Sequence, residues 1–127
     1  MKKIIQTENA PAPIGPYNQA VLFSNILFVS GQIAIDPATG NLITDNIEDE
    51  AHQVLKNVGA ILKEAGLTYN DVLKASVFVK DMGLFGRINA IYAQYFGEEN
   101  APARELVEVT ALPKYVNLEI SVIAGKA

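Results

Sequence analysis

The sequence predicts an α+β fold of two layers, a mixed, mostly antiparallel sheet with two helices on one face. Two segments place apolar residues at helical spacing, and the segments around them alternate as strands do. The predicted order is strand, strand, helix, strand, helix, strand, strand, so each helix connects strands of one sheet as a crossover. A length of 127 residues fits one domain, residues 1–127.

The first predicted strands lie in residues 17–35. The runs "QAVLF" and "ILFVSGQIAI" flank Ser24 and Asn25, which suit a tight turn. Before them, "ENAPAPIGP" is too rich in proline for a flexible linker, and it predicts a loop pinned across the surface. After them, Pro37 and Gly40 predict a turn within "DPATG".

The first predicted helix begins at a capping pair, Asp45 with Glu48, and ends at Gly66. Its apolar stripe contains Ile47, Ala51, Val54, Val58, Ile61 and Ala65. His52 lies off this stripe, which favours a solvated surface histidine over a metal ligand or a catalytic base.

The second half of the sequence predicts a strand at 71–80, a helix at 84–96 that ends at Gly97, and a strand at 104–111. A turn around Pro113 and a last strand at 117–124 follow. Alternation in the first of these strands places Leu73, Ala75, Val77 and Val79 on one face.

The sheet face without helices is expected to be neither fully polar nor fully apolar. Its expected members are Lys74, Ser76, Phe78, Arg104, Leu106, Glu108, Thr110, Asn117, Glu119, Ser121 and Ile123. This mixture favours a buried, partly polar interface between subunits. A monomer with one solvated sheet face is the alternative.

Charge and composition disfavour several classes of partner and site. The net charge of −4 and pI near 4.9 argue against nucleic acid and against anionic membranes. The chain has no cysteine and a single histidine, which leaves little for a metal site, and none is expected. No signal peptide or membrane-spanning run is recognisable, so a cytoplasmic protein is expected.

Four residues are candidates for chemistry. Arg104 follows Pro102 at the mouth of a strand, where a rigid guanidinium suits capture of a carboxylate. Glu119 lies on the half-polar face, where an unpaired carboxylate becomes a perturbed acid or base. Asn89 borders an apolar helix stripe, and Gly31 interrupts a strand, as glycine does where another group approaches closely. Each has an ordinary structural explanation when taken alone.

Together these residues lie in a series of motifs that runs through nearly the whole chain. The most specific are "IGPY", "SGQI", "VFVKD" and the ordered series "PAR", "VEV" and "LPK", with "NVGAILKEAGLTYNDVLKASVFVKDM" and "LEISVIA" beside them. In these motifs the sequence closely resembles the reactive-intermediate deaminases, the Rid or YjgF-type family.

The resemblance implies a chorismate-mutase-like fold whose last strand inserts between earlier strands. It also implies a homotrimer with pockets between subunits. The implied activity is hydrolysis of 2-enamines and 2-imines, such as 2-aminoacrylate and 2-aminocrotonate, to 2-keto acids and ammonia. The implied enzyme is a 2-iminobutanoate/2-iminopropanoate deaminase that uses no metal or cofactor.

Residue roles carry over from the same motifs. Arg104, Glu119 and Tyr17 would be catalytic: Arg104 would hold the substrate carboxylate, and Glu119 would orient or activate the attacking water. The substrate would also be bound by Ser30, Gly31, Asn89 and the backbone around Leu106. Strand alternation sends Glu105 to the face opposite Arg104 and places Leu106 on the Arg104 side.

Two other functions stay open. A non-catalytic trimer that binds keto acids or amino acids could use the same arginine. RNA binding or cleavage is the third alternative, and the acidic balance of the chain disfavours it.

Overall fold

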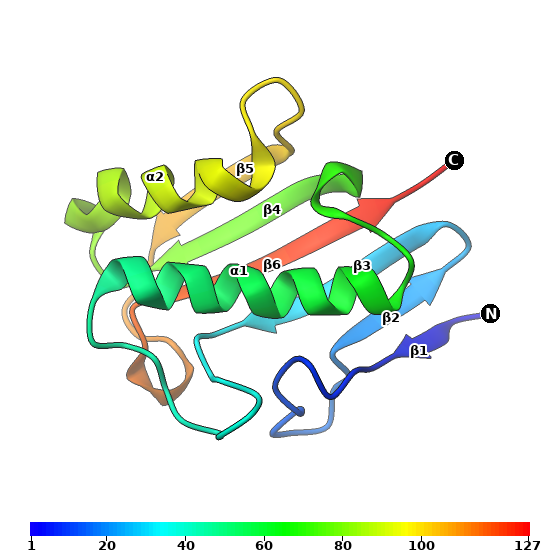
Figure 1. Ribbon diagram of the computed structural model, residues 1–127, viewed down its shortest axis with the longest axis horizontal. Coiled ribbons are helices and arrows are strands. Elements are labelled where there is room, and N and C mark those ends of the chain that lie inside the picture. The colour runs from blue at the N-terminus through cyan, green and yellow to red at the C-terminus, as the bar shows by residue number, and fades with distance from the viewer.

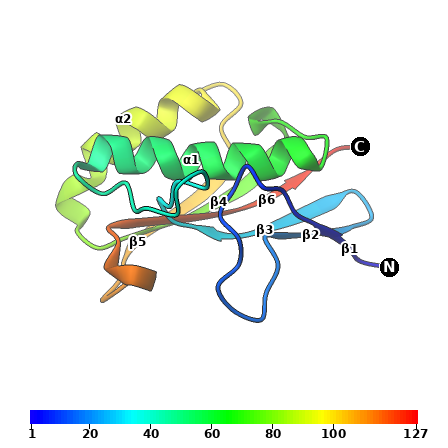
Figure 2. The same ribbon diagram turned by 60° about the horizontal axis from the view of Figure 1, so that its bottom comes forward.

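The computed structural model describes all residues, Met1–Ala127, and contains one six-stranded sheet covered on one side by two helices (Figures 1 and 2). The helices are α1 (Ile47–Glu64) and α2 (Phe85–Phe96). The strands are β1 (Lys3–Ile5), β2 (Ala20–Phe23), β3 (Ile26–Gln32), β4 (Val72–Val79), β5 (Ala103–Glu108) and β6 (Leu118–Gly125), and the short 3₁₀ turns are η1 (Tyr69–Asp71), η2 (Met82–Leu84) and η3 (Pro113–Tyr115). The two-layer α+β prediction is confirmed.

The sheet order is β1-β2-β3-β6-β4-β5, so the last strand lies between β3 and β4. Only β4 and β5 pair in parallel; every other pair is antiparallel. The insertion of β6 was expected from the family resemblance and is confirmed. The short strand β1, which pairs with β2, was not predicted, because "KII" is too short for a pattern to show.

Helix α1 is amphipathic, and its apolar stripe packs on the sheet as predicted: Val54, Leu55, Val58, Ile61 and Leu62 are fully buried. The predicted capping pair is wrong by one residue. Asn46 is the N-cap, and its side-chain oxygen accepts a hydrogen bond from the backbone N–H of Asp49 at 2.8 Å. Past the C-terminal end, Gly66 has a φ of 77°, a conformation that favours glycine.

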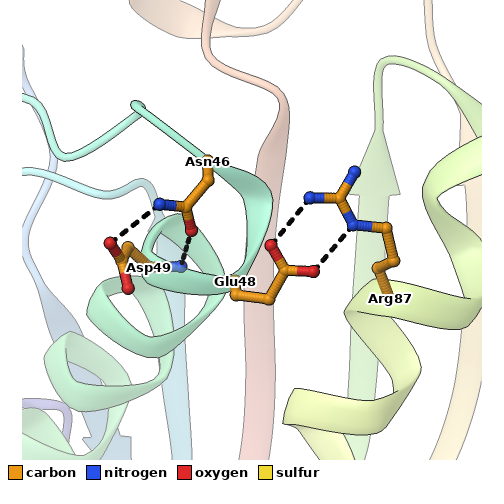
Figure 3. A network of polar contacts seen from close by, with 4 residues as sticks. All are labelled: Asn46, Glu48, Asp49 and Arg87. Atoms are coloured by element: carbon orange, nitrogen blue, oxygen red, sulfur yellow. Dashed lines mark hydrogen bonds and ion pairs between the residues drawn. The ribbon is translucent and has the colours of Figure 1, made fainter.

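An ion pair joins the first turns of the two helices. Arg87 on α2 donates from Nε and Nη2 to both carboxylate oxygens of Glu48 on α1, each at 2.7 Å (Figure 3). The Arg87 side chain holds the pKa of Glu48 down to about 2. Because both groups are exposed to solvent, this pair aligns the helices more than it stabilises them.

Strand β4 corrects the predicted face of one residue. Ala75, Val77 and Val79 are fully buried under the helices as expected, but Leu73 is 52% exposed and Val72 is buried in its place. A register shift between Val72 and Lys74 explains the change, because an irregularity there reverses the alternation.

The face of the sheet that carries no helix, called the open face below, differs from the prediction in two ways. Arg104, Leu106 and Glu108 pair with Ala75, Val77 and Val79, whose side chains are under the helices, so their own side chains lie on the helix side. Asn117 also turns toward α1 and donates from Nδ2 to Glu50 at 2.8 Å. The residues whose strand positions place them on the open face are Phe28, Lys74, Ser76, Phe78, Glu105, Val107, Glu119, Ser121 and Ile123.

The proline-rich loop is pinned as expected, by the buried side chain of Gln19. Its amide nitrogen donates to the backbone oxygens of Thr7, Ala10 and Pro11, and its oxygen accepts from the N–H of Thr7. His52 reaches the surface as predicted, but it is less solvated than expected. His52 is half-buried, and its Nδ1 lies 2.6 Å from the Tyr95 hydroxyl, because α2 packs beside α1. No helix is long and apolar enough to cross a membrane.

Candidate functional site

A small hollow on the open face contains Glu119. Strand β6 presents Glu119 there because its neighbours Leu118 and Ile120 are buried under the helices and β side chains alternate. The hollow is mostly apolar, and a small cluster of Ile33, Leu112 and Val116 packs nearby. Its lining residues are Pro11, Ala12, Ile14, Tyr17, Gln19, Gly31, Gln32, Ile33, Ile35, Pro113 and Glu119.

The Glu119 carboxylate has no hydrogen bond or ion pair within the chain and is half-buried. Burial raises the pKa of Glu119 above its ordinary value, because desolvation disfavours the charged form. A carboxyl group in this state exchanges a proton closer to neutral pH than an exposed one does.

Gly31 makes room for this carboxylate. A Cβ placed on Gly31 would lie 2.7 Å from Cδ of Glu119 and 2.8 Å from Oε2. Gly31 lies where the pairing of β3 with β6 is irregular, at a register shift between Val29 and Gln32. The sequence indicated a close approach at Gly31, and the approaching group is the Glu119 side chain.

Tyr17 and Ser30 lie beside the same hollow. The Tyr17 ring is 47% exposed, and its hydroxyl accepts a weak hydrogen bond from the N–H of Ile14 at 3.4 Å. The Ser30 hydroxyl donates to the backbone oxygen of Asn18 at 2.6 Å, and the Ser30 N–H donates to the oxygen of Gln19. Ser30 thus holds the Tyr17 loop against β3.

Arg104 lies in a second hollow, between β5 and the C-terminal half of α2. Its Nη1 donates to the side-chain oxygen of Asn89 at 2.7 Å, and its guanidinium carbon lies 4.8 Å from the centre of the Tyr92 ring. No carboxylate of the chain pairs with Arg104. The residues that line this hollow are Asn89, Tyr92, Ala93, Gly97, Glu98, Ala101, Pro102 and Arg104.

Backbone groups of β5 are available next to Arg104. β5 is the edge strand and pairs only with β4. Just beyond β5, the N–H of Val109 points toward β4, because it donates to the backbone oxygen of Val79. Since N–H groups alternate in direction along a strand, those of Arg104 and Leu106 point to the free edge. Glu105 lies opposite Arg104, as expected, but on the open face, because Arg104 is on the helix side. Ser76 and Lys74 lower the pKa of the Glu105 carboxyl group, Ser76 most.

The structure thus divides the predicted site residues into two groups. Tyr17, Ser30, Gly31 and Glu119 lie together, and Arg104, Asn89 and Leu106 lie together. The order β3-β6-β4-β5 puts β5 two strands from β6 and three from β3, about 10 and 14 Å at the usual strand spacing. The Arg104 and Glu119 side chains also lie on opposite sides of the sheet.

The sequence did not single out Gln19 or Tyr92. Gln19 carried no signal, because its buried contacts are with loop backbone. Tyr92 carried one, since it lies three residues after Asn89 on the same helix face. No group of three or more His, Cys, Asp or Glu side chains is placed to hold a metal ion.

Comparison with known proteins identifies the family. The family model described as Endoribonuclease L-PSP matches residues 7–126. A RutC family protein of Pyrococcus horikoshii is 54% identical over 99% of both chains. The chain belongs to the Rid (YjgF/RutC) family.

Members of this family with named functions or ligands are also similar to the chain. Human 2-iminobutanoate/2-iminopropanoate deaminase is 44% identical, over 98% of this chain and 90% of the human protein. The crystal structure of Escherichia coli TdcF with bound serine superimposes with a TM-score of 0.93 at 44% identity, over 98% of this chain and 99% of that one. The Rid family resemblance drawn from the sequence is therefore confirmed.

Proposed function

We propose that this protein hydrolyses 2-imino acids and their 2-enamino tautomers to 2-keto acids and ammonia. The observation that carries the proposal is a pair of opposite charges without partners: a guanidinium at Arg104 and a half-buried carboxyl at Glu119. Such a substrate needs a cation for its carboxylate and a proton-exchanging group for water. The 44% identity to the human deaminase supports the same chemistry.

The site is completed, in this proposal, by a second copy of the chain within a homotrimer. The carboxylate and the imine carbon of a 2-imino acid are adjacent atoms. Arg104 and Glu119 of one chain lie on opposite sides of the sheet and two strands apart, so they cannot contact one such molecule. Apposition of the β5 edge of one subunit with the open face of another would bring them together.

The chemistry assigns a separate role to each group. Arg104 would bind the carboxylate, with the free N–H of Leu106 beside it and Asn89 holding the guanidinium. Water would attack C2 of the protonated imine while Glu119 accepts a proton from it, forming a carbinolamine. Glu119 would return that proton to the nitrogen. As the C–N bond breaks and ammonia leaves, the C2 hydroxyl would give its proton to Glu119 and become the carbonyl of the 2-keto acid. An enamine first takes a proton at C3.

Tyr17 and the apolar lining would confine the substrate. A protonated imine is already a strong electrophile, so positioning of water and substrate supplies most of the effect. The hollow around Glu119 is lined by Ile14, Ile33 and Ile35, which suits short aliphatic side chains.

A coupled assay tests the activity. A threonine dehydratase releases 2-aminocrotonate, and formation of 2-ketobutyrate is followed in the presence and absence of the protein. We expect acceleration over buffer and over an equal mass of serum albumin. If 2-ketobutyrate forms no faster with the protein than in buffer alone, the proposed activity is refuted.

The arginine clamp has its own test. Arg104→Ala should lower kcat/KM about ten- to a hundredfold, because hydrogen bonds to charged groups contribute roughly 1.5–3 kcal/mol. Arg104→Lys keeps the charge without the planar donor fork and should recover only part of the loss. Calorimetric binding of 2-ketobutyrate should weaken in parallel. Unchanged affinity in Arg104→Ala would assign the carboxylate to another residue.

Two alternatives remain candidates. A non-catalytic binding protein is favoured by the serine bound to Escherichia coli TdcF; calorimetric binding of serine or 2-ketobutyrate without acceleration in the coupled assay would support it.

RNA cleavage is suggested by the name of the matching family, Endoribonuclease L-PSP, and the net charge of −4 disfavours it. Incubation with end-labelled single-stranded RNA, with Glu119→Gln as control, separates it from deamination.

A further inference from the structure

Three side chains of α2 converge on the Arg104 guanidinium. Phe85, Asn89 and Tyr92 are spaced by four and three residues, so they share one helix face. The guanidinium carbon lies 4.8 Å from the Tyr92 ring centre and 5.8 Å from the Phe85 ring centre, and Nη1 bonds to Asn89. Of the two rings, that of Tyr92 lies closer to the guanidinium.

Tyr92 is an unusual choice for this position. It is 6% exposed, and its hydroxyl is the one buried side-chain polar atom in the chain without a hydrogen-bond partner. An unpaired buried hydroxyl is unfavourable, and phenylalanine would fill the same space without it. Burial raises the pKa of Tyr92, and the nearby Arg104 guanidinium opposes the change without meeting hydrogen-bond geometry at the hydroxyl. The ring therefore stays neutral and leaves the arginine charge uncompensated.

We propose that Tyr92 is a positioning residue for Arg104, and that its ring is the platform that orders the guanidinium before a ligand arrives. An arginine side chain has many rotamers, and fixing them when the ligand binds would weaken affinity. A ring beneath the guanidinium restricts those rotamers in advance through a cation–π contact. The ligand part of this inference rests on the proposed function; the ordering of Arg104 does not.

Two substitutions separate the ring from the hydroxyl. Tyr92→Leu removes the platform and keeps an apolar side chain. Tyr92→Phe keeps the ring and removes only the unpaired hydroxyl, so it should melt at the same or a higher temperature than the parent. Tyr95→Leu is the matched control, because Tyr95 lies on the same helix but bonds to His52, not to Arg104.

The first readout needs no ligand. The ¹⁵N relaxation order parameter of the Arg104 Nε–H should be high in the parent, in Tyr92→Phe and in Tyr95→Leu, and low in Tyr92→Leu. A parent Nε–H that is already disordered, or an unchanged value in Tyr92→Leu, would overturn the proposal. This measurement does not depend on the coupled deaminase assay, so it still tests the ordering of Arg104 if the proposed activity is refuted.

The second readout is a double-mutant cycle on binding of 2-ketobutyrate. Tyr92→Leu should raise Kd and KM about three- to thirtyfold, the range of a buried cation–π contact, while kcat changes little. Tyr92→Phe should restore the parent values. In an Arg104→Ala background Tyr92→Leu should have no further effect, because it acts only through the arginine. Additive losses, or an effect on kcat alone, would refute the positioning role.

Discussion

Glu119 and Arg104 are opposite charges that the chain keeps apart and leaves unpaired. A half-buried carboxylate without a partner is unfavourable, because desolvation is not offset by a hydrogen bond or an ion pair. The same applies to an arginine whose only polar contact is the neutral Asn89. Residues that lower stability in this way are typical of sites that bind or transform a ligand.

Replacing Glu119 by Gln should lower kcat while leaving binding of 2-ketobutyrate nearly unchanged, since the carboxylate acts on water and not on the substrate carboxylate. In the parent, kcat should fall as pH decreases through the raised pKa of Glu119, above the range of an ordinary glutamate. A pH–rate profile of parent and variant measures both effects. Normal turnover by Glu119→Gln would assign the water to another group.

The same substitution should change stability with a defined sign. The pKa of Glu119 is higher in the folded state than in the unfolded state, where it is about 4.3. The contribution of Glu119 to stability is therefore fully present below the unfolded-state pKa and is lost as pH rises through the folded-state pKa. Glu119→Gln should therefore melt higher than the parent at pH 7, and the difference should shrink toward pH 4. Thermal unfolding across this range tests it; a parent that melts higher at pH 7 would contradict the expectation.

Gly31→Ala should impair activity with little change in stability. The added Cβ would lie 2.7 Å from Cδ of Glu119, a mobile side chain that can swing away, so the backbone need not move. We expect kcat to fall about tenfold or more and the melting temperature to stay close to the parent. The double variant with Glu119→Gln should lose no more than the larger single loss. Independent, multiplicative losses would show that Gly31 acts on something other than Glu119.

At the scale of elements, one buried carboxylate ties α1 to the start of β6. Glu50 is fully buried, and its oxygens accept from the N–H groups of Asn117 and Leu118 and from the Asn117 amide, at 2.8, 3.1 and 2.8 Å. The next residue along β6 is Glu119. Through Glu50, helix α1 therefore fixes the position of β6, and Glu119, the candidate base, projects from β6 on the open face.

Glu50→Ala should lower the free energy of unfolding by about 2–5 kcal/mol, because it leaves buried donors unsatisfied at roughly 1–3 kcal/mol each. Glu50→Gln should lose less, since its amide oxygen can accept from both backbone N–H groups while the Asn117 amide turns over. Glu48→Ala, an exposed glutamate of the same helix turn, is the matched control and should change stability far less. Urea unfolding measures all three; equal losses in Glu48→Ala and Glu50→Ala would refute the tie.

At the scale of the whole molecule, the open face is what sets this fold apart from a self-sufficient two-layer domain. Figure 2 shows both helices on the other side of the sheet. Phe28 at 48% exposure and Val107 at 42% lie among Glu105, Glu119 and Lys74 on the open face. Mixed apolar and charged surfaces of this kind are typical of interfaces between subunits.

We expect light scattering to give a mass of three times 13.7 kDa at micromolar concentration. Phe28→Glu places a charge in the middle of the open face and should dissociate the assembly and abolish deaminase activity, because each site needs two subunits. Lys56→Glu on the exposed side of α1 is the control and should leave both unchanged. A parent mass near 13.7 kDa, or an active monomeric Phe28→Glu, would contradict the shared-site model.

The local spacing of apolar and polar residues was sufficient to predict much of this structure. Helical spacing predicted both helices, alternation predicted the faces of β6 and most of β4, and the same alternation placed Glu105 opposite Arg104 and Leu106. These features follow from the period of a single element, so they are visible in the chain without its neighbours. The motifs from "IGPY" to "LPK" identified the family for the same reason, because they are read in order along the chain.

Only the tertiary structure decided which face of the sheet Arg104 occupies. Both alternating sets of β5 are mixed, Arg104 with Leu106 and Glu105 with Val107, so its pattern does not distinguish core from surface. Pairing with β4 settles the choice, as the register shift at Val72 settles the exposure of Leu73. The contact of Gly31 with Glu119 likewise exists only because β6 inserts beside β3, a pairing between segments far apart in sequence.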